Sequence, residues 1–350
     1  MMITLIISLI ALGLILEIIS LRRDPSKLKY NIDLSTACTE PGVPFTVHSI
    51  ISNTSRIPVS YLEITEIYPS LSQIPENVEV EKGKRAELLI KKTCRIRAFK
   101  RKKIALDVLI NKRGIFTFIG DSFKLGDFLG FRVQYLTLMH SRELVVYPEK
   151  RDYPEITEAL GRFFGEVSAK RYLIRDPILT VGIREYTGRE PKKEIHWLQS
   201  ARRAELMVRE LDHNRQLSAC VIMATEEINF TEEEKLDEIC AVARNVCETL
   251  IKTGVAVIFY TNAMVMRSVR KNTCWRCEVS TGRTGELLEG LGRTVGYAVA
   301  SLESLLNYAC RENNQDTAFI VILPEDGTRG EEAVQRLRHK TGRDALIISA

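Results

Sequence analysis

Short, largely apolar runs in the C-terminal half of the sequence constrain its fold more than any other feature. They cover residues 217–223, 255–260, 318–323 and 345–348. A strand with apolar side chains on both faces must be covered on both sides, which is typical of a parallel sheet. Segments with the apolar spacing of amphipathic helices lie between these runs, at 232–253, 295–310 and 331–340. The alternation predicts an α/β domain over residues 217–350 with a covered parallel sheet.

A β-rich domain is predicted ahead of it. At 350 residues, the chain is long enough for two domains of ordinary size. Strand patterns separated by turn signals occur at 45–52, 59–68, 86–96, 104–110, 113–120 and 144–147. Strands at this spacing, with no helical period between them, predict an all-β immunoglobulin-like sandwich over residues 30–148. A connecting region over 149–216 joins the two domains.

Residues 1–21 form an almost wholly apolar run with one charge, Glu17. About 20 such residues in a helix reach roughly 30 Å, so the run predicts a transmembrane anchor in the lipid bilayer. A cleaved signal peptide fits less well, because no basic residue precedes the run. The following linker, 22–29, contains Arg22, Arg23, Lys27 and Lys29. The positive-inside rule then predicts a single-pass protein of the cell membrane with its soluble domains in the cytoplasm.

Composition excludes several classes of protein. The net charge of +5 is small and does not indicate a nucleic-acid partner. The eight cysteines lack the spacing of a disulfide framework, which favours free thiols in a reducing compartment. No phosphate-binding loop is present, and no pattern indicates a cofactor. The identity of any small-molecule ligand stays open.

The segment Gly182–Arg202 combines a tyrosine, a histidine, a tryptophan and charges of both signs. It resembles the signature of the domain-of-unknown-function 58 family, roughly R-E-Y-x-x-G-D-x-x-R-x-I-x-W-x-x-x-A-R. The matching residues are Arg184, Glu185, Tyr186, Gly188, Ile195, Trp197, Ala201 and Arg202. One position differs, because Arg189 stands where the family has an acid. The stretches at 113–116, 126–131 and 146–148 also look like family landmarks.

This resemblance implies a von Willebrand factor A-like, Rossmann-like fold for the C-terminal domain. It also implies a MoxR-type AAA+ ATPase as partner. The predicted fold class is thus an N-terminal transmembrane helix, then the sandwich, then the α/β von Willebrand factor A-like domain.

Two interpretations of the signature stay open. In the structural one, Ile195 and Trp197 hold the segment against a sheet, while Arg184 and Arg202 pair with Glu185 or Glu194. In the functional one, the segment presents a docking surface, since aromatic and arginine side chains are the usual anchors of interfaces. Its candidate interaction residues are Arg184, Glu185, Tyr186, His196, Trp197 and Arg202.

Such α/β domains bind ligands at the carboxyl ends of the strands. A magnesium site there would use an Asp-x-Ser-x-Ser sequence after the first strand, because the ion takes hard oxygen ligands. The corresponding position is Ala224, Thr225 and Glu226, with neither an aspartate nor paired serines. Glu226 is predicted to be solvated, and Thr231 to cap the following helix. We therefore predict a degenerate site without metal.

Four other patterns each have a structural and a functional interpretation. Cys274 and Cys277 form a lone C-x-x-C, which we interpret as structural. His196 and Ser200 are four residues apart, but no orienting acid accompanies them for catalysis. Asp127 is predicted to tie down a glycine-rich turn. The basic stretch 91–103 either contacts anionic lipid or is a hairpin with solvated charges.

The sequence thus predicts a membrane-anchored, non-enzymatic interaction or assembly protein. Two alternatives stay open. One is an enzyme that acts on an envelope glycan or peptide through the signature, and the other is an extracytoplasmic adhesion module.

Overall fold

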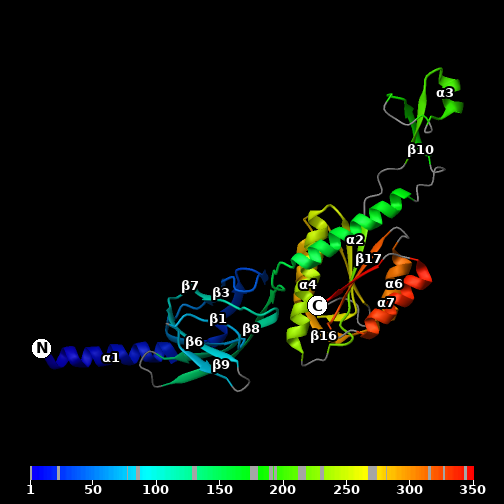
Figure 1. Cartoon of the computed structure of the whole chain (residues 1–350). Helices are drawn as coiled ribbons and strands as arrows, with labels where there is room; N and C mark the ends of the chain where they lie inside the picture. The colour runs from blue at the N-terminus through cyan, green and yellow to red at the C-terminus, as the bar shows by residue number, and fades with distance from the viewer. Residues whose placement is uncertain are drawn as a thin grey trace. The chain divides into compact units, whose positions relative to one another are not determined.

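The structure of the chain is a computed structural model (Figure 1). It describes residues 2–21, 24–76, 78–83, 87–127, 132–173, 180–188, 192, 195–211, 218–228, 232–266, 274–280, 282–313, 317–325, 328–342 and 345–350. Arg22, Arg23 and Thr231, to which the sequence assigned roles, lie outside these residues.

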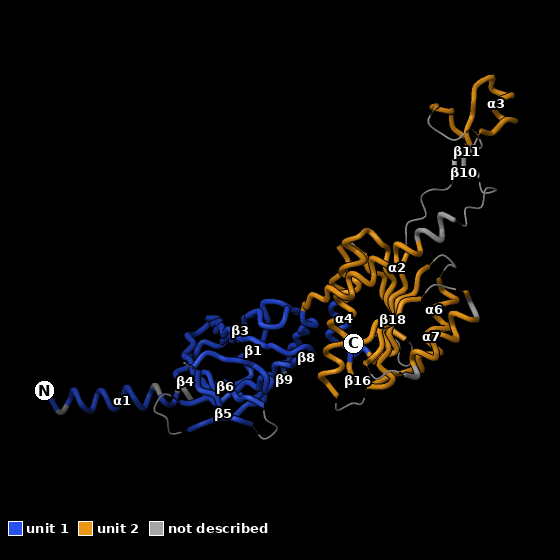
Figure 2. The backbone as a smooth tube through the Cα atoms, in the orientation of Figure 1, with its two compact units in different colours: residues 1–149, 265–267, 288–294 blue, residues 150–264, 268–287, 295–350 orange. Residues whose placement is uncertain are grey.

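The chain divides into two compact units (Figure 2). Unit 1 comprises residues 1–149, 265–267 and 288–294, and unit 2 comprises residues 150–264, 268–287 and 295–350. Two short segments from the second half of the sequence therefore belong to the unit that the first half builds.

Unit 1 is a sandwich of two sheets. The smaller sheet has the strand order β1-β3-β7, and all of its pairs are antiparallel. The larger has the order β2-β9-β8-β4-β6-β5, antiparallel except for the pair β2–β9. The strands are β1 (Leu28–Leu34), β2 (Cys38–Thr39), β3 (Phe45–Asn53), β4 (Val59–Tyr68), β5 (Val80–Lys82), β6 (Leu88–Ile96), β7 (Arg101–Val108), β8 (Gly114–Gly126) and β9 (Val133–Val146). The predicted β-sandwich is therefore present.

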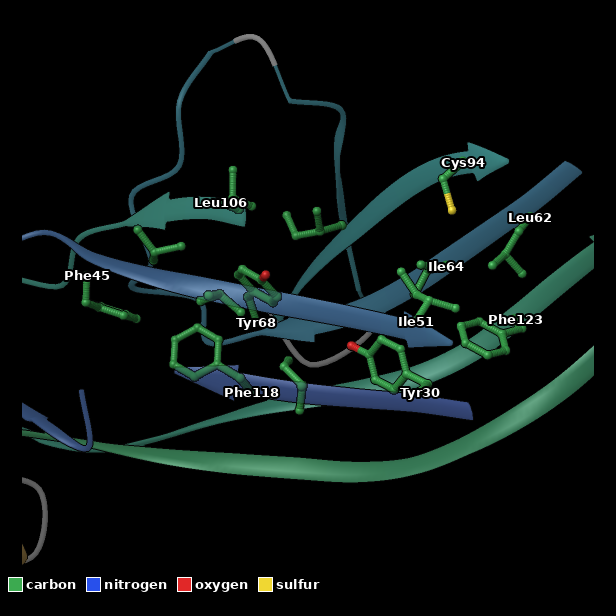
Figure 3. Packing of buried hydrophobic residues seen from close by; sticks show 14 of the residues in the cluster. Tyr30, Phe45, Ile51, Leu62, Ile64, Tyr68, Cys94, Leu106, Phe118 and Phe123 are labelled. Carbon is green, nitrogen blue, oxygen red and sulfur yellow. The ribbon is translucent and has the colours of Figure 1, made fainter. Parts of the chain in front are cut away.

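The sandwich core follows from the alternation of side chains along its strands. In β3, every second residue is buried, as expected when one face of a strand packs inward. Aromatic rings fill the space between the sheets (Figure 3). Tyr30 and Phe123 meet edge to face at 5.4 Å between ring centroids, and Tyr68 and Phe118 do so at 5.0 Å.

Unit 2 contains a five-stranded sheet in the order β15-β13-β12-β17-β18. Its strands are β12 (Ser218–Met223), β13 (Ala256–Thr261), β15 (Trp275–Val279), β17 (Ala318–Leu323) and β18 (Ala345–Ser349). Four of them run parallel, whereas β15 pairs antiparallel with β13. The prediction of a wholly parallel sheet is therefore wrong at one edge. Strand β15 was not predicted, although the alternation of apolar and charged residues at 275–279 is a strand pattern.

Helices cover both faces of this sheet (Figure 1). The helix α4 (Glu233–Lys252) lies on one face, and α6 (Leu302–Glu312) and α7 (Thr328–Thr341) lie on the other, where they share a core with β12 and β17. The remaining elements are α2 (Pro154–Leu173), β10 (Thr180–Glu185), α3 (Trp197–Arg203), β11 (Met207–Leu211), β14 (Ala263–Val265), α5 (Thr284–Gly292) and β16 (Thr294–Ala298). The helix predicted at 295–310 is wrong at its start, because β16 occupies residues 294–298 and pairs with β14.

The predicted transmembrane anchor needs correction. Residues Met2–Leu21 do form a helix, α1. Within the described residues, however, none of the helices combines the length and apolar character that a bilayer crossing requires. An apolar run predicts a helix because its backbone groups must bond within the segment, but it does not identify the surrounding medium. The predicted anchor at 1–21 and the single-pass membrane location are thus not supported.

The predicted fold class is corrected accordingly. The helix at 2–21 is no longer assigned as transmembrane. The structure does not show that the last domain is von Willebrand factor A-like. What the described residues establish is a β-sandwich followed by a mixed five-stranded sheet covered by helices.

Candidate functional site

The sequence signature folds into a small module of two strands and one helix, which we call the signature module (residues 180–188 and 195–211). Its strands β10 and β11 pair antiparallel, with Arg184 opposite Val208 and Glu185 opposite Met207. Residue Ile195 adds an isolated bridge to Val208. The module therefore places both Arg184 and Ile195 next to Val208 of β11, although they are eleven residues apart in the sequence.

Hydrogen bonds between two side chains and the backbone hold the helix α3 in this module. The imidazole Nδ1 of His196 accepts a bond from the N–H of Gln199 at 3.2 Å and so caps the first turn. The hydroxyl of Ser200 donates to the carbonyl of His196 at 3.0 Å and accepts from the N–H of Met207 at 2.8 Å. Ser200 thus joins the helix to β11.

These bonds bear on the catalytic alternative for the same two residues. A nucleophile and its base must share a hydrogen bond. In the structure the Ser200 hydroxyl bonds to two backbone groups, and the ring nitrogen of His196 caps a helix. Both groups therefore have structural roles, and the geometry gives no support to hydrolase chemistry here.

The signature divides into a buried part and an exposed part. Ile195, Met207 and Val208 are buried at 5% exposure or less. Trp197 is 67% exposed and Leu198 is 63% exposed. The structural interpretation is therefore right for Ile195 and wrong for Trp197, which does not hold the segment to the sheet.

The other candidate residues lie on the same module. Arg184, Glu185 and Arg202 are exposed, and Tyr186 is partly buried, with its backbone N–H bonded to the carbonyl of Leu206. The guanidinium of Arg184 donates to the carbonyl of Glu185 at 3.4 Å. Glu194, the other predicted partner, lies outside the described residues, as do Arg189 and Glu190. The module thus presents tryptophan, leucine and arginine side chains to solvent.

The degenerate metal position lies at the carboxyl ends of β12 and β13. The side chain of Asn262 accepts a bond from the N–H of Thr225 at 2.9 Å and donates to the carbonyl of Ala300 at 3.0 Å. The carboxylate of Glu226 accepts from the N–H of Leu302 at 2.7 Å, in the first turn of α6, where a negative charge is favourable. Glu226 is exposed, as predicted, but its carboxylate also bonds to the start of α6, which the sequence did not predict.

These polar groups connect loops to one another. Thr225 and Asn262 are buried, and their hydrogen bonds join the ends of two strands to the segment before α6. Across the described parts of the chain, no cluster of three or more His, Cys, Asp or Glu residues could hold a metal ion. The amide of Asn262 acts here as a cross-link, which the sequence did not predict because Asn262 follows a different strand.

The two cysteines of the C-x-x-C sequence do not form a pair. Residues three apart in or next to a strand point to opposite faces of a sheet. Cys274 packs on the α6 side, whereas Cys277 is buried at 2% exposure. Burial, followed by the charges of Glu286 and Glu278, raises the pKa of the Cys277 thiol to about 12. The thiol therefore stays protonated and unreactive, as the structural interpretation predicts.

A buried polar cluster in the sandwich core was not predicted. The ammonium of Lys92 on β6 lies 2.7 Å from the carboxylate of Glu66 on β4. It also donates to the hydroxyls of Ser49 at 2.8 Å and Tyr68 at 3.0 Å. Tyr30 donates to the second carboxylate oxygen of Glu66 at 2.7 Å. We call these five residues the core ion cluster, and it connects the two sheets.

The environment of this cluster is strongly desolvated. Glu66 and Ser49 are wholly buried, and Lys92 is 8% exposed. Burial, and then the charge of Glu66, raise the pKa values of Tyr30 and Tyr68 well above the ordinary tyrosine value. Both phenols therefore keep the protons with which they bond to Glu66. The proposal that the whole stretch 91–103 is a solvated or lipid-facing surface is wrong for Lys92.

A signal for the cluster exists in the sequence. Ile64, Glu66 and Tyr68 alternate along one strand, so all three side chains point to the same face. The same parity places Lys92 between Ile90 and Cys94 on β6. A glutamate and a lysine at inward positions of two neighbouring strands predict a buried ion pair.

Asp127 ties the turn after β8, as expected. Its carboxylate accepts a bond from the backbone N–H of Arg132 at 2.6 Å, and its own N–H donates to the carbonyl of Arg132 at 3.2 Å. Residues 128–131 between them lie outside the described residues.

A pocket of about 630 Å³ lies in unit 2 between the start of α2 and the end of α4. Tyr153 at its edge donates to Glu238 at 2.6 Å, and burial together with this bond raises the pKa of Tyr153 to about 12. Asn245 donates to the carbonyl of Arg151 at 3.0 Å. Among the described lining residues there is no histidine, serine or cysteine, so the pocket offers no familiar nucleophile with its base.

No protein-family model matches the chain, and no curated protein matches it either. Solved β-sandwich structures show a partial likeness. A CARDB domain from Pyrococcus furiosus, solved with di-metal ions, is 11% identical over 34% of this chain and 91% of that chain, with a TM-score of 0.24. A cohesin module of a family 33 glycoside hydrolase from Clostridium perfringens is 14% identical over 33% of this chain and 96% of that chain, with a TM-score of 0.27.

A cohesin–dockerin complex from Clostridium thermocellum is 13% identical over 34% of this chain and 99% of that chain, with a TM-score of 0.25. These likenesses cover about a third of this chain and are too slight to carry an argument about its partners. The assignment to the domain-of-unknown-function 58 family therefore stays a prediction.

Proposed function

We propose that this chain is a non-enzymatic interaction protein that docks a partner protein through the exposed face of its signature module. One observation carries the proposal. Trp197 and Leu198 are the first two residues of α3, and both are more than 60% exposed, whereas Ile195, Met207 and Val208 of the same module are buried.

The energetics of burial support this choice of surface. A tryptophan side chain can bury roughly 150–250 Å², so exposing one forgoes a large favourable contribution to folding. Leu198 and Arg202 are four residues apart and therefore neighbours on one face of the helix. A tryptophan, a leucine and an arginine together have the composition of an interface anchor.

We propose a MoxR-type AAA+ ATPase as the partner, on the strength of the sequence resemblance. The exposed arginines Arg184, Arg202 and Arg203 would favour an acidic rim around an apolar pocket on such a partner. Electrostatic attraction of this kind increases the association rate and decreases with salt.

The test is a binding measurement between the purified chain and a MoxR-type ATPase of the same organism. If the proposal is right, Trp197→Ala weakens binding about thirtyfold, which corresponds to roughly 2 kcal/mol. Arg202→Glu should reduce the association rate and its dependence on salt.

Tyr135→Ala is a matched control, because Tyr135 is a 72% exposed aromatic residue on unit 1. It should bind as the wild type does. Circular dichroism and thermal melting establish that each variant is folded. Equal binding by wild type and a folded Trp197→Ala variant would contradict the docking role of the module.

A further inference from the structure

Three chain connections meet at one end of the sandwich in unit 1. They are the 3₁₀ turn η1 (Pro25–Lys27) before β1, the loop 54–58 between β3 and β4, and the turn 97–100 between β6 and β7. Thr54 bonds to the carbonyl of Lys27, through its N–H at 2.9 Å and its hydroxyl at 2.7 Å. The first two connections are thus tied together.

Asn53 fixes the third connection to the second. Its buried side chain donates to the carbonyls of Ile57 at 2.9 Å and Arg97 at 3.3 Å. Its backbone N–H donates to the carbonyl of Lys100 at 2.9 Å, and the N–H of Phe99 donates to the carbonyl of Ser55 at 3.2 Å. The backbones of the three connections at this end of the sandwich are therefore cross-linked.

The surface is strongly basic and has an aromatic residue in its outermost turn. Its exposed members are Lys27, Arg56, Arg97, Phe99 and Lys100, which we call the basic tip. Exposed Arg95 and Arg101 continue the positive charge along β6 and β7. The acid Asp24 also lies here, and its carboxylate accepts a bond from the N–H of Ser26.

Phe99 is unusual in two respects. Its ring is 65% exposed. Its backbone has φ of +53°, in the left-handed region that disfavours bulky side chains. Glycine or asparagine would suit this turn better. A phenylalanine whose backbone is strained and whose ring gains little from burial indicates a role for the ring outside the fold.

We propose that the basic tip docks on an anionic lipid surface, with the Phe99 ring at head-group level and the basic side chains on the lipid phosphates. Phenylalanine side chains of membrane-surface proteins insert at the boundary between head groups and acyl chains, and clustered lysine and arginine residues are attracted to anionic leaflets. A single-stranded nucleic acid would instead be bound by a basic groove with several stacked aromatics. The tip is a turn that carries one aromatic ring. This contact is peripheral, and it requires no membrane-spanning segment.

The test uses the full chain and sedimentation with two kinds of vesicle. One is pure phosphatidylcholine, and the other also contains phosphatidylserine. The quantity measured is the ratio of binding to anionic over neutral vesicles, so any binding through the apolar helix α1 contributes to both. We expect a ratio well above one that falls as salt is added.

Two sets of variants locate the contact. Arg97→Glu together with Lys100→Glu should lower anionic binding by about tenfold or more. Arg311→Glu together with Arg336→Glu changes charge equally on exposed positions of unit 2 and should leave binding unchanged. Phe99→Gly should weaken binding about fivefold, because one aromatic ring is lost from the interface, and at the same time raise the melting temperature, because it removes the positive-φ strain.

If the turn had only a structural role, Phe99→Gly would change the melting temperature without changing vesicle binding, and this result would contradict the proposal. Equal binding of wild type to neutral and anionic vesicles would overturn the proposal. So would equal losses for the tip and control charge reversals, or binding to a single-stranded oligonucleotide with no preference for anionic vesicles.

Discussion

Glu66 is a wholly buried carboxylate, and its two oxygens accept hydrogen bonds from two tyrosine hydroxyls and one ammonium group. Removing a charge from water is unfavourable unless a partner and hydrogen bonds compensate for the lost hydration. Lys92 and the two phenols provide this compensation, and the Lys92 ammonium also lies 5.4 Å from the centre of the Tyr68 ring. Each member of the core ion cluster is therefore necessary to the others.

Replacing one partner of this ion pair should destabilise unit 1 strongly. We expect Lys92→Met to lower the free energy of unfolding by about 3–5 kcal/mol, because Glu66 is left as an unpaired buried charge. Chemical denaturation measures the effect. The double variant Lys92→Met, Glu66→Leu should recover much of the loss.

Lys91→Met is the neighbouring control for this experiment. Lys91 pairs with Glu81 at the surface, so its replacement should change stability little. A Lys92→Met variant as stable as Lys91→Met would show that the buried pair contributes little.

The two tyrosines of the cluster should make unit 1 sensitive to alkali. Their pKa values are raised in the folded state, whereas an unfolded tyrosine ionises near 10.0. Above this pH the unfolded chain loses protons that the folded chain retains, so stability that is present below about pH 10 decreases as the pH rises.

Denaturation curves between about pH 8 and about pH 11 test this expectation. The variant Tyr30→Phe, Tyr68→Phe removes both groups and should show a flatter decrease above about pH 10, from a lower starting stability. Equal slopes for variant and wild type would assign the alkaline sensitivity of unit 1 to other groups, such as the Cys94 thiol, whose pKa is raised by burial.

At the scale of secondary structure, the sequence predicted a strand best where its side chains are apolar on both faces or alternate clearly between a buried and an exposed face. The predicted strands at 59–68 and 318–323 coincide with β4 and β17, because one alternates regularly and the other is wholly apolar. The sequence patterns failed where pairing with a distant strand determines whether a segment is a helix or a strand. Thr294–Ala298 forms β16 through its pairing with β14, although the surrounding sequence has helical spacing.

The candidate site was predictable to a similar degree. Composition and the family resemblance together identified the signature, and the composition identified Trp197 as a candidate anchor. It could not show that Ile195 is buried and Trp197 exposed, because that depends on the bridge to Val208 and on the helix start at Trp197. The alternation along β4 and β6 indicates that Glu66 and Lys92 point inward, but their pairing across 26 residues of sequence is not contained in any local pattern.

The signature module should depend on one hydroxyl group. We expect Ser200→Ala to weaken the packing of α3 on β11 by about 1–3 kcal/mol, because the buried N–H of Met207 loses its acceptor. Hydrogen exchange at Met207 and limited proteolysis of residues 195–211 report the change.

Gln199→Ala serves as the control, because its backbone N–H still bonds to His196 and its side chain is only partly buried. Exchange at Met207 that is as slow in Ser200→Ala as in wild type would mean that the hydroxyl is dispensable.

At the scale of the whole molecule, unit 1 is completed by chain from far along the sequence. The guanidinium of Arg113 donates to the carbonyls of Leu291 at 2.8 Å and Thr294 at 2.9 Å. Arg293 forms ion pairs with Glu143 and Glu289. A side chain at Gly292 would approach Val145 to 2.6 Å, so the segment 288–294 packs closely against β9.

Loss of this attachment should destabilise unit 1 specifically. We expect Arg113→Ala to lower its free energy of unfolding by about 1.5–3 kcal/mol, because two bonds from a charged donor are removed. Hydrogen exchange at Val145 and Val146 should become faster, while exchange in β17 of unit 2 should not change.

Arg142→Ala, at an exposed arginine of the same β9 strand, is the control and should leave exchange at Val145 as in wild type. Unchanged exchange at Val145 in Arg113→Ala would show that residues 288–294 contribute no stability to the sandwich.

The attachment of residues 288–294 also sets an order of events during biosynthesis. The ribosome finishes residue 149 and must then add 145 more residues (294 − 149) before the last segment of unit 1 exists. At ordinary translation rates this delay is on the order of ten seconds. During that time the part of β9 around Val145 lacks its contact with residues 288–294, so the sandwich is incomplete. A nascent chain stalled before residue 288 should therefore need a chaperone more than one stalled after residue 294.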